Sequence, residues 1–390
     1  MDATEEWLRA EQAATGGPVP LRRLARELVR GGDPRAAAAV YDRAYALDPG
    51  DADLAGERGE LLDRLAVEEH GLTFRYVPAG TFLMGSETAD LDEWPVHRVR
   101  LDGYWLSETP VSWSAYCRLM GWLPPPDGYP PKDDDAGTVD RRALFTLDGA
   151  NRIRLQYCED ESTRAIDWHA HDPRMRLTRG DEPVDPVSVF GVPPRANPDR
   201  PFAYDQKPMV CVAAQDAEEL CERISTEAVR YRLPTEAEWE RAARGGLVGR
   251  HYPWGDEPPT PQRCDFDRFD EFSILPMRRH PPNGYGLYGM AGSVWEWTAD
   301  RYDAEYYLES PVENPTGPVD GEQRVLRGGS WADCAGAVSV SFRMSRACTS
   351  WRDGAWGGHI APNIGFRLCR TELPAAQESG RAVTGRGRPG

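Results

Sequence analysis

Residues 284–297 hold the first side chains that could do chemistry: four glycines, two tyrosines, two tryptophans and one carboxylate in fourteen positions. So many glycines oppose a helix and favour backbone with positive φ, so we expect a loop here. Glu296 stands between Trp295 and Trp297, and a carboxylate buried there needs a cation or hydrogen bonds to offset its desolvation. The stretch therefore predicts a rigid centre whose backbone carbonyls and Glu296 could hold a hard metal ion.

A histidine pair is the second candidate for chemistry. On a strand, His169 and His171 would face the same side, as two metal ligands do. The spacing identifies no third ligand, and histidines are common on protein surfaces. The pair is therefore either part of a metal site or an ordinary exposed feature, and the sequence leaves both open.

Composition limits the class of protein. The chain has 390 residues, 40% of them hydrophobic, with 13 Trp, 38 Gly and 34 Pro, which predicts a real core within a loop-rich fold. The net charge of -17 disfavours nucleic-acid binding. Eight cysteines without a Cys-x-x-Cys pair oppose a zinc ribbon or redox dithiol and favour buried thiols. No apolar segment indicates export or membrane insertion, so we expect a cytoplasmic protein with no membrane partner.

Residues 1–70 are expected to be helical. Apolar residues recur at helical spacing over 20–67, with breaks at residues 31–34 and 48–50. The stretch 32–49 resembles part of a tetratricopeptide repeat, but at most one and a half repeats fit, fewer than a free-standing solenoid needs. The segment must therefore lean on the main domain or on a partner. A packed helical cap and a partner-docking surface are the two alternatives.

The rest of the chain predicts short strands and helices around an insert. Residues 74–86 alternate like a hairpin turning at Pro78–Gly80, and residues 95–101 alternate like a further strand. Thr235 and Glu238 form a capping box for a helix that ends at Gly245. Residues 122–206 are rich in Pro and Asp and lack periodicity, which indicates an atypical insert. The polar tail 371–390 is expected to be disordered.

Six blocks in this order resemble the sulfatase-modifying-factor family, the formylglycine-generating enzymes and their relatives. The blocks begin at Arg232, Tyr252, Asn283, Gly292, Arg327 and Asn363 (Arg-Leu-Pro-Thr-Glu-Ala-Glu-Trp-Glu, Tyr-Pro-Trp-Gly, Asn-Gly-Tyr-Gly-Leu-Tyr, Gly-x-Val-Trp-Glu-Trp, Arg-Gly-Gly-Ser-Trp, Asn-Ile-Gly-Phe-Arg). The resemblance implies an α+β, C-type-lectin-like fold with little regular structure over residues 71–370. It also implies an oxidase site and two calcium sites.

The family's oxidase site needs two cysteines shortly after the Gly-Gly-Ser block, where soft thiolates hold copper(I). By the resemblance, these positions fall on Asp333 and Val338, with Cys334 one residue late. We therefore expect no copper. Any remaining site would lie in the cleft between Trp295 and residues 330–334. Its candidate residues are Cys334, Ser330 and Trp295 for catalysis, and Asp333, Trp331 and Arg343 for binding.

The implied calcium sites match only in part. The candidate ligands are Glu296, Met290, Gly292, Val294, Asp265 and Phe266. Gly289 stands where one family site has an Asn ligand, and water can replace a single lost ligand at reduced affinity. Two alternatives stay open for Glu296: a calcium ligand, or a buried carboxylate held by hydrogen bonds in a structural keystone.

Two functions follow. In the first, the chain is a protein- or peptide-binding module that does not generate formylglycine, and residues 1–70 and the insert 122–206 contact a protein partner. In the second, it is an oxidoreductase like the formylglycine-generating or non-haem-iron relatives, acting on a peptide or small molecule. The iron relatives take their ligands from a separate three-histidine helical domain, and residues 1–71 hold only His70, so we expect no iron. Stoichiometric copper or iron would separate the two functions.

Overall fold

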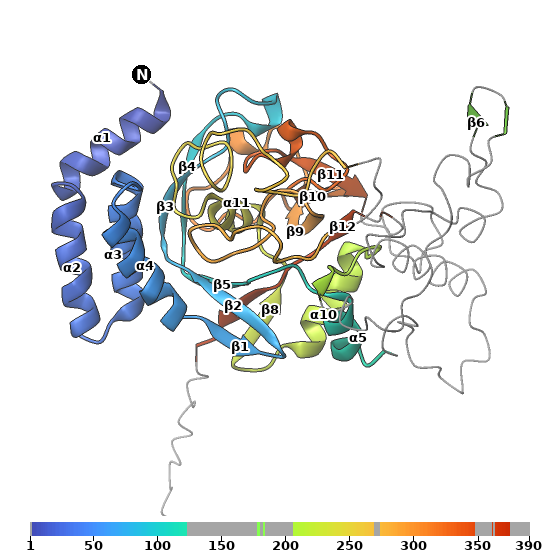
Figure 1. Cartoon of the computed structure of the whole chain (residues 1–390), viewed down its shortest axis with the longest axis horizontal. Helices are drawn as coiled ribbons and strands as arrows, with labels where there is room; N and C mark the ends of the chain where they lie inside the picture. Colours follow the sequence, from blue (N-terminus) through green and yellow to red (C-terminus); the bar gives the residue numbers. More distant parts are fainter. Residues whose placement is uncertain are drawn as a thin grey trace, which may run out of the picture.

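The computed structural model describes residues 2–122, 178–179, 182–183, 206–268, 274–347, 361 and 363–374. Four helices precede a domain of short strands, short helices and long connecting loops (Figure 1). The fold is α+β, as the sequence predicted. Of the predicted insert, only its two end residues and residues 178–179 (β6) and 182–183 (β7) are described, and the histidine pair at 169 and 171 lies outside the described residues.

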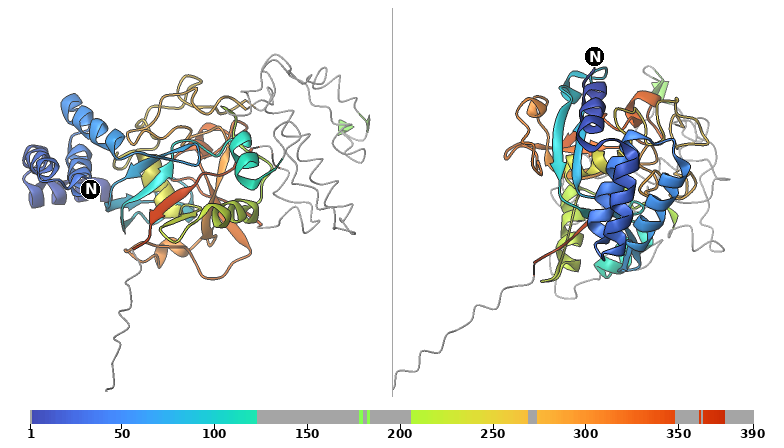
Figure 2. Two further views of the ribbon diagram at one scale, coloured as in Figure 1. Left: turned by 90° about the horizontal axis from the view of Figure 1, so that it is seen from below. Right: turned by 90° about the vertical axis from the view of Figure 1, so that its left-hand side faces the viewer.

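The N-terminal helices lie on one flank of the domain (Figures 1 and 2). They are α1 (Ala3–Thr15), α2 (Pro18–Arg30), α3 (Pro34–Leu47) and α4 (Ala52–Arg64). Asp33 caps α3 by accepting the amide of Ala36, and Asp51 caps α4 by accepting the amide of Leu54. Asp33 lies in the predicted break 31–34, and Asp51 directly follows the predicted break 48–50. Helix α1 lies within the segment 1–70 predicted to be helical, before the periodic residues 20–67.

A five-stranded antiparallel sheet forms one half of the domain. Its order is β1 (Val67–Glu69), β2 (Leu72–Val77), β5 (Tyr104–Ser107), β13 (Cys369–Glu372) and β8 (Val229–Arg232). Strands from the beginning and the end of the domain, β5 and β13, are neighbours in it. This pairing brings the last block of the chain, residues 363–370, into the centre of the molecule.

A four-stranded sheet carries the residues predicted to do chemistry. Its order is β11 (Met344–Ala347), β10 (Gln323–Arg327), β9 (Trp295–Arg301) and β12 (Ile364–Gly365), and β12 runs parallel to β9. The glycine-rich stretch 284–297 leads into β9, and the Gly-Gly-Ser block leaves β10. Because β9 and β10 are paired, these two segments lie side by side.

The predicted hairpin at residues 74–86 is wrong. Strand β2 pairs with β1 and β5, whereas β3 (Gly80–Met84) pairs with β4 (His97–Leu101) in a separate two-stranded sheet. The two strands therefore lie in different sheets. Neither alternates strictly, because Tyr76 and Val77 of β2, and Phe82 to Met84 of β3, are consecutive buried residues. Arg241 fixes the junction, because its Nη2 donates to the carbonyl of Pro78 at 2.9 Å.

Helix α11 (Glu236–Arg244) runs through the core, and every one of its nine residues is buried. The capping box predicted for it is present: the Thr235 hydroxyl accepts the amide of Glu238 at 3.2 Å, and Glu238 accepts the amide of Thr235 at 2.8 Å. Gly245 ends the helix with φ of 60°. Helices α5 (Trp113–Met120) and α10 (Ala214–Ile224) pack against each other.

Three 3-10 turns complete the domain: η1 (Leu91–Glu93), η2 (Tyr306–Leu308) and η3 (Ala335–Val338). Turn η3 follows the Gly-Gly-Ser block, and η1 and η2 contact each other. In the part of the chain that the structure describes, no helix has the length and apolar character needed to cross a membrane.

Candidate functional site

Ser330 and Asp333 form a closed hydrogen-bonded group after β10. Asp333 Oδ2 accepts the Ser330 amide at 3.0 Å and also accepts the Ser330 hydroxyl. Asn363 Nδ2 donates to the same hydroxyl oxygen at 3.0 Å. Gly329 permits this turn, because its φ is 69° and a Cβ there would lie 2.6 Å from the carbonyl of Ala337. The carboxylate is thus used to order the loop.

The other predicted cleft residues separate into two places. Trp295 and Trp331 are buried beside this group, and the Trp331 amide donates to the carbonyl of Ser293 at 3.0 Å. Arg343 lies elsewhere: its Nε and Nη2 donate to Glu236 at 2.8 and 3.1 Å, and its guanidinium lies 4.3 Å from the centre of the Tyr307 ring. Arg343 therefore holds the core together and does not line the cleft.

Cys334 is the exposed thiol among the described cysteines. Val338, at the other position implied for a copper-binding cysteine, is buried and packs in a small apolar cluster with Cys264 and Ala291. Burial raises the pKa of the Cys264 thiol to about 12, so this thiol stays protonated at neutral pH. The described residues therefore supply one accessible thiol here, without a second thiolate beside it.

Glu296 is held by an arginine. Arg367 Nε donates to Glu296 Oε2 at 2.6 Å and its Nη2 donates to Oε1 at 2.7 Å. The indole of Trp239 donates to Oε2 at 2.7 Å, and both charged groups are fully buried. A carboxylate has about four lone pairs, and three are used here. This is the geometry of the second alternative, a buried carboxylate held by hydrogen bonds.

The remaining calcium candidates meet at another point. Residues 265 and 292 form an isolated parallel bridge, and the Ser293 amide donates to the carbonyl of Asp265 at 2.8 Å. Asp265 and Met290 line a cavity of about 30 Å³, enough for one water-sized particle. Phe266 packs on the Cys264 cluster. Neither Gly292, Val294 nor Glu296 lines that cavity.

Two polar atoms inside this cavity lack hydrogen-bond partners within the described residues, His280 Nε2 and Ser293 Oγ. Burial raises the pKa of the Asp265 carboxyl, although Arg268 donates to it at 2.7 Å. Burial also lowers the pKa of His280. The unpaired histidine nitrogen and serine hydroxyl therefore offer hydrogen-bonding positions to a small polar guest such as water.

A groove of about 730 Å³ lies where the turn between α3 and α4 meets the main domain. Its walls include four prolines and two aromatic rings, together with two arginines that each pair with a carboxylate that also lines the groove. The lining residues include Tyr45, Pro49, Arg250, Trp254, Arg263 and Pro281. Its volume and position between two parts of the chain are typical of ligand sites.

Sequence reasoning missed a buried polar network that joins the helices to the domain. Asp42 of α3 accepts Arg58 Nη2 at 2.7 Å, Arg241 Nη2 at 3.2 Å and the Tyr285 hydroxyl at 2.8 Å. Arg58 Nη1 also donates to the carbonyl of Gly284 at 2.7 Å. One feature of the sequence could have indicated this network: nearly all of the basic residues are Arg and not Lys. Guanidinium groups suit buried ion pairs with several hydrogen bonds.

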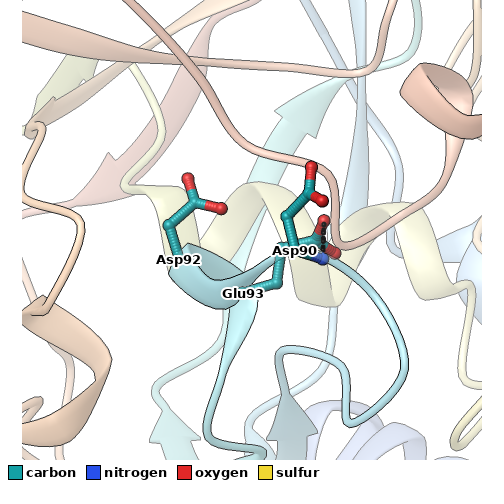
Figure 3. Close-up of side chains that lie close together, drawn as sticks. All are labelled: Asp90, Asp92 and Glu93. Carbon is teal, nitrogen blue, oxygen red and sulfur yellow. Dashed lines mark hydrogen bonds between the residues drawn. The ribbon is translucent and has the colours of Figure 1, made fainter.

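An acidic cluster lies at η1. One carboxylate oxygen from each of Asp90, Asp92 and Glu93 lies within 4.8 Å of the others (Figure 3). The carboxylates of Asp90 and Asp92 project to one side of the turn, whereas Glu93 folds back to accept the amide of Asp90 at 3.4 Å. Glu93 is buried and closes this turn, so its role is structural.

Comparisons with known proteins agree with this architecture. A formylglycine-generating enzyme of Thermomonospora curvata is 31% identical over 319 residues, covering 76% of this chain and 93% of that protein. A bovine protein named inactive C-alpha-formylglycine-generating enzyme 2 is 37% identical over 172 residues, covering 41% of this chain and 49% of that protein. The solved structure of PvdO from Pseudomonas aeruginosa shares the fold, with a TM-score of 0.50 and 22% identity over 79% of this chain and 98% of that chain.

The family model described as sulfatase-modifying factor enzyme 1-like domain matches residues 66–372, which run from the end of α4 to the end of β13. The match includes both sheets, the Ser330–Asp333 loop and the Glu296–Arg367 pair. By this match the chain belongs to the sulfatase-modifying factor enzyme 1-like family.

Proposed function

We propose that this chain is a protein- or peptide-binding member of its family that does not generate formylglycine. One observation carries the proposal: the carboxylate of Asp333 is bonded to Ser330 at the position implied for the first copper-binding cysteine. Val338, at the position implied for the second, is a buried aliphatic side chain. A hard oxygen and a methyl group do not form the soft two-thiolate site that copper(I) prefers.

The groove between the α3–α4 turn and the domain supports the binding part of this proposal. Its volume of about 730 Å³ suits a short peptide segment, and its Trp254 and Tyr45 rings provide apolar contact area. Residues 1–70 are our proposed contact with a protein partner, together with the insert 122–206. The family relative named as inactive supports the idea that this fold persists without the oxidase reaction.

Compartment and calcium are finer parts of the proposal. We place the protein in the cytoplasm, and its support is that Cys221, Cys264, Cys334 and Cys369 are free thiols, the usual state in a reducing compartment. Calcium enters only at the small cavity, where Asp265 and Met290 would hold it. Glu296 does not line this cavity and is paired with Arg367, whereas calcium would have to share the Asp265 carboxylate with Arg268.

The oxidoreductase alternative has one observation in its favour. Cys334 is exposed beside Asp333, so a thiol is accessible at the position where the family has its chemistry. A single thiol could react with a peptide or a small molecule if a redox partner were supplied. A substitution of Cys334 by Ser separates this alternative from the binding function, because binding through the groove does not use the thiol.

The test combines metal binding with peptide oxidation. We expect the purified full chain to contain less than about 0.1 equivalent of copper or iron, to lose copper(I) to a competing chelator, and to leave a cysteine-containing peptide unoxidised by mass spectrometry. The matched variant is Asp333→Cys/Val338→Cys, which should gain one tightly held copper(I). Stoichiometric copper in the unmodified chain, or peptide oxidation that Cys334→Ser abolishes, would overturn the proposal.

A further inference from the structure

Turns η1 and η2 carry large apolar side chains that face solvent. Leu91 is 89% exposed, Trp94 is 51% exposed and Leu308 is 56% exposed. Single exposed apolar side chains are normal on a protein surface, whereas exposed apolar side chains on neighbouring segments mark interaction sites. These three residues come from segments more than two hundred positions apart in the chain.

The fold holds the two turns against each other. The hydroxyl of Tyr302 donates to Asp92 Oδ2 at 2.8 Å, and η1 contacts η2 directly. Arg343 Nη1 donates to the carbonyls of Asp92 and Asp303, at 2.7 and 3.2 Å. Since Arg343 is buried and also bonded to Glu236, this junction is rigid, and the apolar side chains above it are presented in a fixed arrangement.

The same face is strongly acidic. Asp90 and Asp92 project from η1 (Figure 3), and the segment that leads into and out of η2 adds exposed carboxylates. These acidic residues are Asp90, Asp92, Asp303, Glu305 and Glu309. The guanidinium of Arg343 pairs with Glu236 beneath this face and also interacts electrostatically with Asp92, so it offsets part of the negative charge. The face therefore combines exposed apolar side chains with more carboxylates than this one guanidinium neutralises.

We propose that this face, defined by Leu91, Trp94 and Leu308 with the five surrounding carboxylates, docks a basic amphipathic segment of a protein partner. The inference rests on the proposed binding function and adds a contact surface to it, separate from residues 1–70 and the groove. Charge complementarity selects the occupant: Lys and Arg side chains would meet the carboxylates, while apolar side chains of the same segment would cover Leu91, Trp94 and Leu308.

The chemistry of the face disfavours other ligands. Calcium requires six to eight oxygens, and Glu93 is used to close the turn, so η1 offers only Asp90 and Asp92. A phosphate-rich partner, whether nucleic acid or an anionic membrane, would be repelled by the same carboxylates. A basic protein segment is the partner that gains from both features of the surface.

The test uses the full chain and a fluorescently labelled synthetic peptide of Leu and Lys whose Leu residues recur at positions i, i+3, i+4 and i+7, so that the peptide forms an amphipathic helix. We expect micromolar binding by anisotropy at physiological salt, and at least about fivefold weaker binding for Leu91→Ser/Leu308→Ser, because central apolar anchors carry most binding energy. The matched control is Val319→Ser/Leu373→Ser, two residues outside this face and outside residues 1–70 that are 94% and 39% exposed, which should bind as the unmodified chain does.

A second pair of variants tests the charge. Glu305→Gln/Glu309→Gln should weaken binding several-fold and flatten its dependence on salt, whereas Glu222→Gln/Glu227→Gln, which removes the same charge from two other exposed positions, should do neither. Unchanged affinity in the Leu91/Leu308 and Glu305/Glu309 variants would overturn the proposed surface. The proposed surface would also be overturned if the chain bound calcium and the Asp90→Asn/Asp92→Asn variant did not. If the peptide-binding experiments fail, the copper and peptide-oxidation measurements still test the proposed function, because they do not depend on this surface.

Discussion

At the residue scale, Arg367 binds Glu296, the carboxylate that the sequence marked as a candidate metal ligand. The carboxylate of Glu296 is buried among indoles, as its position predicted, and its charge is neutralised by the two parallel hydrogen bonds of Arg367. Such a pair contributes little net stability relative to an apolar pair, but breaking it leaves an uncompensated charge in the core. The pair therefore fixes how β9 and the segment after β12 fit together.

Replacing Glu296 by Gln should destabilise the fold by about 3–5 kcal/mol, because the Arg367 guanidinium would stay buried without a counter-charge. Urea unfolding followed by tryptophan fluorescence measures the change. The control is Glu313→Gln, which breaks a pair with Arg100 in which both side chains are more than half exposed and which should cost less than about 1 kcal/mol. Equal effects of the two substitutions would contradict the role given to Glu296.

At the element scale, the glycine-rich stretch 284–297 is a junction between parts of the chain that are distant in sequence. Its first residues contact α4 and the end of α11, its middle forms the bridge to residue 265, and its end becomes β9. Glycine is needed where backbone approaches backbone. A Cβ on Gly292 would lie 2.1 Å from the carbonyl of Asp265, whereas a Cβ on Gly289 would meet nothing within 4 Å.

The two glycines make a matched pair of tests, because both have positive φ, 72° at Gly292 and 65° at Gly289. Gly289→Ala should cost only the backbone strain, about 1–2 kcal/mol. Gly292→Ala should cost more than that, because the bridge to Asp265 must also open. Free energies of unfolding from urea titration give the comparison, and a smaller loss for Gly292→Ala would count against the close approach.

At the scale of the whole molecule, the helices α1–α4 belong to the same folded unit as the domain. The carboxylate of Asp42 joins two buried arginines and the hydroxyl of Tyr285, and those partners lie on α4, on α11 and in the glycine-rich stretch. The groove beside this network has walls from both parts. This arrangement agrees with the first alternative for residues 1–70, a helical cap packed on the domain. A protein partner could then contact the outer surfaces of α1 and α2.

One unfolding transition is therefore expected for the helices and the domain together. Far-ultraviolet circular dichroism follows the helices, and tryptophan fluorescence mainly reports the domain, since Trp7 alone among the 13 tryptophans lies in α1–α4. Asp42→Asn should shift both signals together by about 3–5 kcal/mol, because two buried guanidiniums lose their charge partner. Glu11→Gln, at a more exposed pair with Arg43, should shift neither by more than about 1 kcal/mol. Separate transitions for the two signals would mean independent units.

Local signals in the sequence determined the features that depend on neighbouring residues. The caps Asp33, Asp51 and Thr235 mark helix starts because their side chains bond to amides two or three positions ahead. The ordered motif blocks identified the α+β fold and the family. The sequence also showed that Asp333 and Val338 stand at the two positions implied for the copper-binding cysteines.

Tertiary structure decided whatever depends on which distant segments meet. The pattern at residues 74–86 could not show that β2 and β3 belong to different sheets, because buried residues in both strands fit either pairing. The charge at Glu296 could not show its partner, since a metal ion and a guanidinium offset a buried carboxylate equally well in principle. The partner that the structure places beside Glu296 is Arg367, which reaches this carboxylate because β12 pairs with β9, a contact between distant segments that no local pattern predicts.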